Sequence, residues 1–279
     1  MKDKTKKPVR ALVLTGNGTN CEREMAHACK LGGVDHVEIV HIAWLLDGDV
    51  SLRDFDFLNL PGGFLDGDDM GAARASANRF KYRKIKGTTT TLLEEIQRFV
   101  EDGKLVFGVC NGFQLLVKLG LLPGIQRNAP PSQMVTLTHN DSGKFEDRWV
   151  TLSVNAESPC VFTKGITHIY LPVRHGEGKF YPKSEDVLDI IKEKRLNTLM
   201  YCSPETGEPT NQYPYNPNGS IGAIAGLCDA TGRVFGMMPH PEAFLHRTNH
   251  PRWTRENLPE EGEGIIFFKN AVEYLKERN

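Results

Sequence analysis

The stretch that decides the fold is Leu105-Val106-Phe107-Gly108-Val109-Cys110-Asn111-Gly112-Phe113-Gln114. Its apolar first half predicts a buried strand, and the apolar spacing from 111 to 119 predicts a helix. Cys110 stands between the two, and the glycines on either side leave room for a sharp turn, as in a nucleophile elbow. The start of a helix favours a thiolate and supplies N–H groups to a developing oxyanion. A buried, inert core cysteine is the alternative interpretation of Cys110 taken alone.

Strands and helices alternate along the first 120 residues. Apolar runs predict strands at 9–14, 37–40, 57–60 and 105–109, and amphipathic spacing predicts helices at 22–31, within 87–100 and at 111–119. This alternation predicts an α/β fold with a mostly parallel central sheet flanked by helices. The second half adds strands at 149–154, 167–172, 221–227 and 234–238, and a last helix near 265–276.

The chain reads as one domain spanning residues 1–279. Residues 1–8 are basic and predict a flexible N-terminus, and two stretches, 65–87 and 203–220, have the composition of inserted loops. No internal repeat or linker-like shift in composition divides the chain.

Composition excludes several classes of protein. The net charge of −1 lacks the basic excess of a nucleic-acid binder, and 39% hydrophobic residues suffice for a core. The apolar runs are too short for a membrane span or a signal peptide, which predicts a cytoplasmic protein. The six cysteines include no Cys-x-x-Cys pair, so we expect neither disulfides nor a structural metal site.

A thiol nucleophile needs a base, and His240-Pro241-Glu242 supplies a candidate just past an apolar strand. In an extended segment, side chains two positions apart point the same way, so Glu242 can orient the His240 imidazole. The alternative is a surface loop in which the prolines only end the strand.

Pro61-Gly62-Gly63 ends the strand at 57–60 and is the third element. Such a turn can direct a backbone N–H toward a neighbouring strand end, as a second oxyanion donor beside the N–H of Asn111. Gln114 lies four residues after Cys110 and shares a helix face with it, so it can meet whatever Cys110 attacks. Taken alone, the glycine pair is an ordinary tight turn.

Together these motifs resemble the triad (class I) glutamine amidotransferases, which have a flavodoxin-like fold. The segments 18–22, 60–64, 108–116, 175–180, 216–220 and 236–242 resemble one branch in particular. That branch is the glutamine amidotransferase subunits of phosphoribosylformylglycinamidine synthase, an enzyme of purine biosynthesis. The similarity extends over most of the chain.

The resemblance implies a role for each motif. Cys110 would attack the side-chain amide of glutamine, His240 would move the proton and Glu242 would orient His240. Gly62, Gly63 and Asn111 would line the oxyanion hole, and Gln114 would help to hold glutamine. Glutamate and ammonia are the products, with no metal and no cofactor in this chain.

The resemblance also implies partners. In the family, a large synthetase subunit uses ATP and Mg²⁺ to convert formylglycinamide ribonucleotide to the amidine, and a small third subunit joins the complex. This chain has no phosphate-binding Gly-x-x-x-x-Gly-Lys-Ser/Thr motif of its own. We expect neither nucleic acid nor membrane as a partner.

Some features depart from the family or stay open. Leu65-Asp66-Gly67-Asp68 replaces the usual Ser-Tyr-Gly-Asp, and the segment after His246 is long. We interpret Cys21 and His175 as structural, and His246 and His250 as an improbable metal pair because Pro251 follows and acidic ligands are missing. Another cysteine hydrolase, or an interaction protein with a decayed site, remains an alternative.

Overall fold

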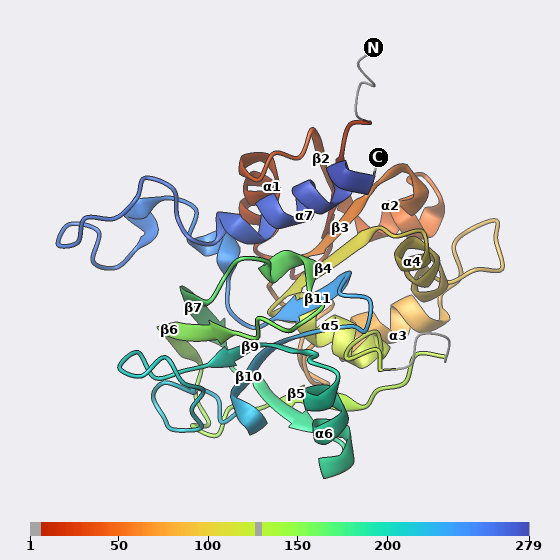
Figure 1. Ribbon diagram of the computed structural model, residues 1–279. Helices are drawn as coiled ribbons and strands as arrows, with labels where there is room; N and C mark the ends of the chain where they lie inside the picture. The colour runs from red at the N-terminus through yellow and green to blue at the C-terminus, as the bar shows by residue number, and fades with distance from the viewer. Residues whose placement is uncertain (1–6, 126–129, 279) are drawn as a thin grey trace.

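A nine-stranded sheet runs through the molecule, which is described here from a computed structural model covering residues 7–125 and 130–278 (Figure 1). In spatial order the strands are β2 (His36–His41), β1 (Arg10–Thr15), β3 (Phe57–Leu60), β4 (Leu105–Val109), β11 (Val234–Met237), β10 (Ile224–Cys228), β9 (Asn197–Tyr201), β6 (Glu146–Val154) and β7 (His168–His175). A separate antiparallel pair is formed by β5 (Val135–Thr138) and β8 (Lys179–Pro182). The helices are α1 (Glu22–Leu31), α2 (Ile42–Asp47), α3 (Arg74–Tyr82), α4 (Leu92–Glu101), α5 (Asn111–Leu119), α6 (Glu185–Glu193) and α7 (Ile265–Arg278).

The sheet has a parallel half and an antiparallel half. Strands β2, β1, β3, β4 and β11 pair in parallel, whereas β10, β9, β6 and β7 continue the sheet by antiparallel pairs. Parallel neighbours need long crossovers, which the helices of the first half supply, while the short turn after β10 allows only an antiparallel return. The predicted α/β fold is therefore confirmed, with a parallel core and the added strands on one side.

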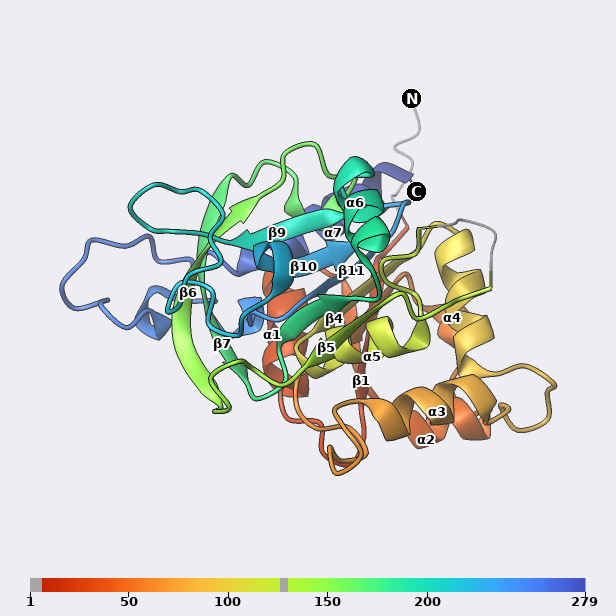
Figure 2. The ribbon, with the colours of Figure 1, turned by 90° about the horizontal axis from the view of Figure 1, so that it is seen from below.

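Helices cover the parallel half. Helix α1 packs against α7, and α3 packs against both α4 and α5. Figure 2 shows α3, α4 and α5 grouped beside the parallel strands. Between the layers, Phe107 of β4 stacks on Phe235 of β11 with ring centroids 5.3 Å apart, and both rings contact Phe267 of α7. This aromatic core fixes the central strands that end at the site.

The segment 65–87, expected as a loop, contains the nine-residue helix α3. Most residues of this segment are charged or small, but α3 has a narrow apolar face, on which Ala77 and Phe80 are buried. The second expected loop, 203–220, contains no helix or strand. Most of the predicted flexible N-terminus, residues 1–6, lies outside the described residues.

Local capping explains the start of α4 but not that of α1. The helix expected within 87–100 begins at Leu92, because Thr91 and Glu94 form a reciprocal capping box. Helix α1 is preceded by Cys21, and no side chain caps it. Within the described part of the chain, none of the helices is both long enough and apolar enough to cross a membrane.

Candidate active site

Four neighbouring strands end at the same edge of the sheet, and the site lies there. The loops after β1, β3, β4 and β11 carry Cys21, Gly62, Cys110 and His240. These residues, or their immediate neighbours, line one pocket of about 360 Å³. Parallel strands place their carboxyl ends side by side, which is where ligands bind in open α/β sheets.

Cys110 occupies the sharp turn expected between β4 and α5. Its backbone is held at φ 51° and ψ −105°, outside the ordinary regions for a residue with a side chain. A Cβ on Gly112 would lie 1.9 Å from the Leu60 carbonyl oxygen, so only glycine fits two positions after the cysteine. The Cys110 side chain is buried, and its Sγ lies 3.6 Å from the carbonyl oxygen of Arg174.

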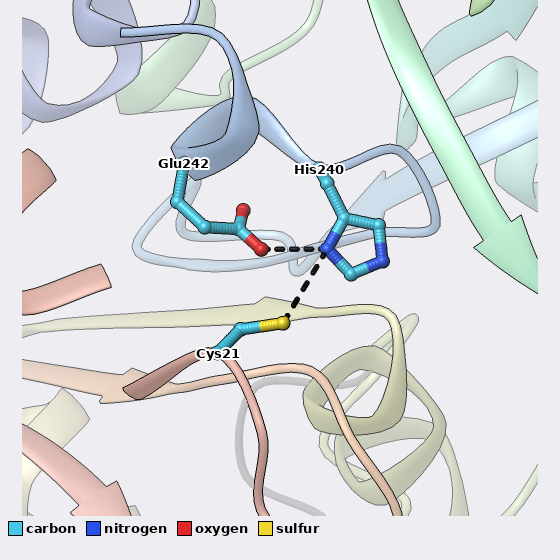
Figure 3. A group of neighbouring side chains, drawn as sticks. All are labelled: Cys21, His240 and Glu242. Atoms are coloured by element: carbon cyan, nitrogen blue, oxygen red, sulfur yellow. Dashed lines mark hydrogen bonds and ion pairs between the residues drawn. The ribbon is translucent and has the colours of Figure 1, made fainter. Parts of the chain in front are cut away.

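His240 and Glu242 form a buried pair on the loop after β11. Their Nδ1 and Oε1 atoms are 2.6 Å apart, and both side chains are at most 3% exposed (Figure 3). Burial alone would lower the pKa of His240, but the Glu242 carboxylate and the Cys110 thiol raise it well above its usual range. The expected orientation of His240 by Glu242 is thus present, and the pair can hold a proton.

Cys21 lies on the other side of the same imidazole nitrogen. Its Sγ is 4.0 Å from His240 Nδ1, the atom that already binds Glu242 (Figure 3). Burial raises the pKa of the Cys21 thiol, partly offset by the hydrogen bond to His240. The sequence interpretation of Cys21 as structural rather than nucleophilic did not include this contact with His240. The signal that could have found it is its place in the loop that follows the parallel strand β1.

Cys21, His240 and Glu242 present a thiol, an imidazole and a carboxylate within 4.8 Å of one another, a donor set that suits zinc. Two ligands of one tetrahedral zinc stand about 3.3 Å apart, given bonds of about 2.0–2.2 Å. The 2.6 Å between His240 and Glu242 is shorter and fits a hydrogen bond. The pair is therefore arranged as a hydrogen-bonded pair suited to proton transfer.

The Gly62-Gly63 turn is compressed between the loop after β1 and His240. Gly62 accepts hydrogen bonds from the backbone N–H groups of Asn20 and Cys21 at 3.1 and 3.2 Å. A Cβ on Gly62 would lie 2.8 Å from Cε1 of His240, and Gly63 has φ 132° with Asn20 N only 2.6 Å from an added Cβ. Both glycines are required by space or conformation. Their role as oxyanion donors stays a prediction.

Asn111 and Gln114 link the turn at Cys110, through hydrogen bonds, to two other segments around the pocket. Asn111 accepts from the Leu65 N–H at 3.0 Å and donates to the Gln114 side-chain oxygen at 3.1 Å. Gln114 in turn donates to the carbonyl of Glu177 at 2.6 Å. Gln114 lines the pocket, as expected for a substrate contact, and also positions the segment that carries Glu177.

His175 lines the pocket and is hydrogen-bonded, as its structural interpretation predicted. It is buried, with Nδ1 3.1 Å from the side-chain oxygen of Asn140. Burial, with the neighbouring His240, lowers the pKa of His175 to about 3, so it is neutral.

His246 and His250 do not form a pair. His246 Nε2 lies 3.4 Å from His27 Nε2, whereas His250 Nδ1 accepts from the Arg252 N–H at 3.2 Å.

Comparisons with known proteins agree on one family. Residues 8–275 match the CobB/CobQ-like glutamine amidotransferase domain. The phosphoribosylformylglycinamidine synthase subunit PurQ of Dehalococcoides mccartyi is 44% identical over 269 residues, 96% of this chain and 98% of that protein. The PurQ subunit of Methanococcus maripaludis is 39% identical over 278 residues, 95% of this chain and 98% of its own. A chain of the PurLQS structure from Thermotoga maritima superimposes with a TM-score of 0.67 at 29% identity, covering 96% of this chain and 100% of that one.

Proposed function

This chain belongs to the CobB/CobQ-like glutamine amidotransferases and, among them, to the phosphoribosylformylglycinamidine synthase subunits, and on that premise we propose how it hydrolyses glutamine. The products are glutamate and ammonia. The observation that carries the proposal is the meeting of the Cys110 elbow and the buried His240–Glu242 pair in one pocket.

Cys110 is the nucleophile. Its thiolate attacks the amide carbon of glutamine, and the developing oxyanion is met by the backbone N–H groups of Gly63 and Asn111. His240 gives its proton to the departing nitrogen, which leaves as ammonia, and a glutamyl thioester remains on Cys110. Water then attacks the thioester while His240 takes its proton. Glutamate leaves as the γ-carboxylate after its carboxyl proton passes to solvent, and the Cys110 thiolate and the His240 imidazolium are restored.

Cys110 rather than Cys21 suits this role for two physical reasons. Cys110 precedes the first turn of α5, whose N–H groups and dipole favour a thiolate and an oxyanion. Cys21 instead approaches Nδ1 of His240, which Glu242 already occupies, while Nε2 has no partner among the described residues. A base needs its second nitrogen free for the reacting proton.

The ammonia goes to a synthetase. Free ammonia is lost to solvent unless its release is coupled to a second reaction, and the related Thermotoga maritima structure bears the name PurLQS. We assign this chain the place of the glutaminase subunit. It delivers ammonia to a large, ATP- and Mg²⁺-dependent subunit that converts formylglycinamide ribonucleotide to formylglycinamidine ribonucleotide, with a small third subunit. The chain uses no cofactor of its own. All six cysteines are free thiols, which suits the reducing cytoplasm.

Glutamate release tests the proposal. The chain is assayed with glutamine, alone and with its synthetase partners, as the parent and as Cys110→Ala, with Cys21→Ala as the matched control. We expect weak release alone, strong stimulation in the complex, loss in Cys110→Ala and retention in Cys21→Ala. Release that no partner stimulates would favour an independent cysteine hydrolase, and absence of release under all conditions would refute the proposal.

A further inference from the structure

Asp68 is a carboxylate in the lining of the pocket, and it takes no part in the chemistry at Cys110. It lies in the segment between Gly63 and α3 and lines the same pocket as Cys110, Gln114 and His240. Its Oδ1 atom is shielded from solvent and has no hydrogen-bond partner among the described residues. A shielded carboxylate oxygen is costly to leave unpaired, so it is suited to a donor that arrives from the pocket.

The surroundings of Asp68 compensate its charge only in part. No ion pair within the described part of the chain includes Asp68; the nearby Glu177 adds negative charge, which outweighs the opposing effects of the Ala73 backbone N–H and of Lys118. Both carboxylate oxygens of Glu177 face the Ala72 N–H, at 3.4 and 3.2 Å, so Glu177 is occupied by the protein itself. Burial, and then Glu177, raises the pKa of Asp68. A bound cation would relieve both effects.

Glutamine carries such a cation at the end opposite its reacting amide. When the amide lies at Cys110, the α-ammonium must face another part of the pocket wall. The pocket-lining carboxylates are Asp68 and Glu177, and Asp68 is the one with an unpaired oxygen. Arg174, also in the lining, can meet the α-carboxylate, because its own ion pair with Asp147 is long, at 3.9 Å, and exposed to solvent.

We propose that Asp68 binds the α-ammonium group of glutamine and selects free α-amino acid amides over amides that lack this group. The proposal rests on the glutaminase function proposed above. The pair is a charge-assisted hydrogen bond inside a pocket, which is among the stronger polar contacts in proteins. N-acylated or peptide-linked glutamine has no ammonium and would leave Oδ1 unpaired, so it would be rejected.

The test compares Asp68→Asn with the parent in the reconstituted synthetase complex. Two substrates are used: glutamine, and glutaramate, which has the same amide but no amino group. Asp69→Asn is the matched control, because Asp69 is the adjacent carboxylate, is exposed and does not line the pocket. We expect Asp68→Asn to raise KM for glutamine about 10- to 100-fold with little change in kcat. The rate with glutaramate should change less than about twofold.

The glutaramate rate also reports folding, because a misfolded variant would lose both substrates together. Equal losses with glutamine and glutaramate would assign Asp68 a structural role and overturn the proposal. An unchanged KM for glutamine would overturn it as well. If the parent complex releases no glutamate, the glutaminase function itself fails, which is a separate result.

Discussion

Gly62→Ala is the change that most sharply tests the geometry around His240. The added methyl carbon would lie 2.8 Å from Cε1 of His240, 3.4 Å from Sγ of Cys21 and 3.5 Å from Cβ of Cys110. Carbon atoms pack at about 3.5–4.0 Å, so the imidazole must retreat by roughly 0.7 Å. Gly62 does not have a left-handed φ, so the alanine backbone itself is not strained.

The expected effect is on catalysis more than on stability. A displacement of about 1 Å in a catalytic constellation costs roughly 100-fold in rate, so we expect kcat to fall about 10- to 100-fold. This corresponds to about 1.4–2.7 kcal/mol in the activation free energy. Overpacking costs a typical protein about 1–3 kcal/mol of unfolding free energy, which leaves a folded domain.

Glutamate release by the reconstituted complex measures kcat, and a urea titration of the isolated chain measures the free energy of unfolding. A folded Gly62→Ala variant with kcat within about twofold of the parent would refute the reasoning, because His240 would then not need its present position.

Two further predictions concern the buried histidines. Glu242→Gln should lower kcat about 10³- to 10⁴-fold without unfolding the chain, because the amide can donate to Nδ1 of His240 and impose the wrong tautomer; retained activity in the glutamate assay would contradict this. His175 has a folded pKa of about 3 against about 6.5 when unfolded, so its contribution to stability is complete above pH 6.5 and is lost as the pH falls toward 3. Between pH 8 and pH 5 this loss is about 2 kcal/mol of unfolding free energy. In urea titrations, the unfolding free energy of His175→Gln should therefore change less with pH than that of the parent, by about this amount. If the unfolding free energies of the parent and of His175→Gln depend equally on pH, His175 is not the source of the pH dependence.

The central elements of the fold and the places of Cys110 and His240 could be predicted because they are encoded locally. The apolar strand, the two glycines and the helix around Cys110 fit one another at fixed spacing. The same holds for the strand that ends before His240. Once a parallel sheet is inferred, the carboxyl ends of its strands must share one edge, and this brings Cys110 and His240 together.

Other elements were missed although the sequence contains signals for them. Val135 and Leu137 alternate with threonines, which is a strand pattern, and they form the buried face of β5. Ser184 caps α6, and Val187 and Ile191 lie four positions apart on its buried face. Helix α3 gives no such signal, because its composition is largely polar. Its buried face is defined only by its packing against α4 and α5.

The remaining site residues depend on the paths of loops. Cys21 approaches His240 because the loop after β1 is hydrogen-bonded to Gly62. Asp68 enters the pocket through a segment that the Leu65 N–H anchors to Asn111. Neither contact follows from periodicity, because each joins residues distant in sequence through irregular backbone.

Identification of the reacting thiol is the measurement that tests the central claim most directly. The glutamine analogue 6-diazo-5-oxo-L-norleucine alkylates a thiol that attacks at the amide position, and trypsin then separates the two candidates. Cys110 lies in the peptide 105–118 and Cys21 in the peptide 11–23. We predict one label per chain on peptide 105–118, protection by glutamine and loss of activity in parallel with labelling. A label on peptide 11–23, with peptide 105–118 unmodified, would contradict the assignment of Cys110 as the nucleophile.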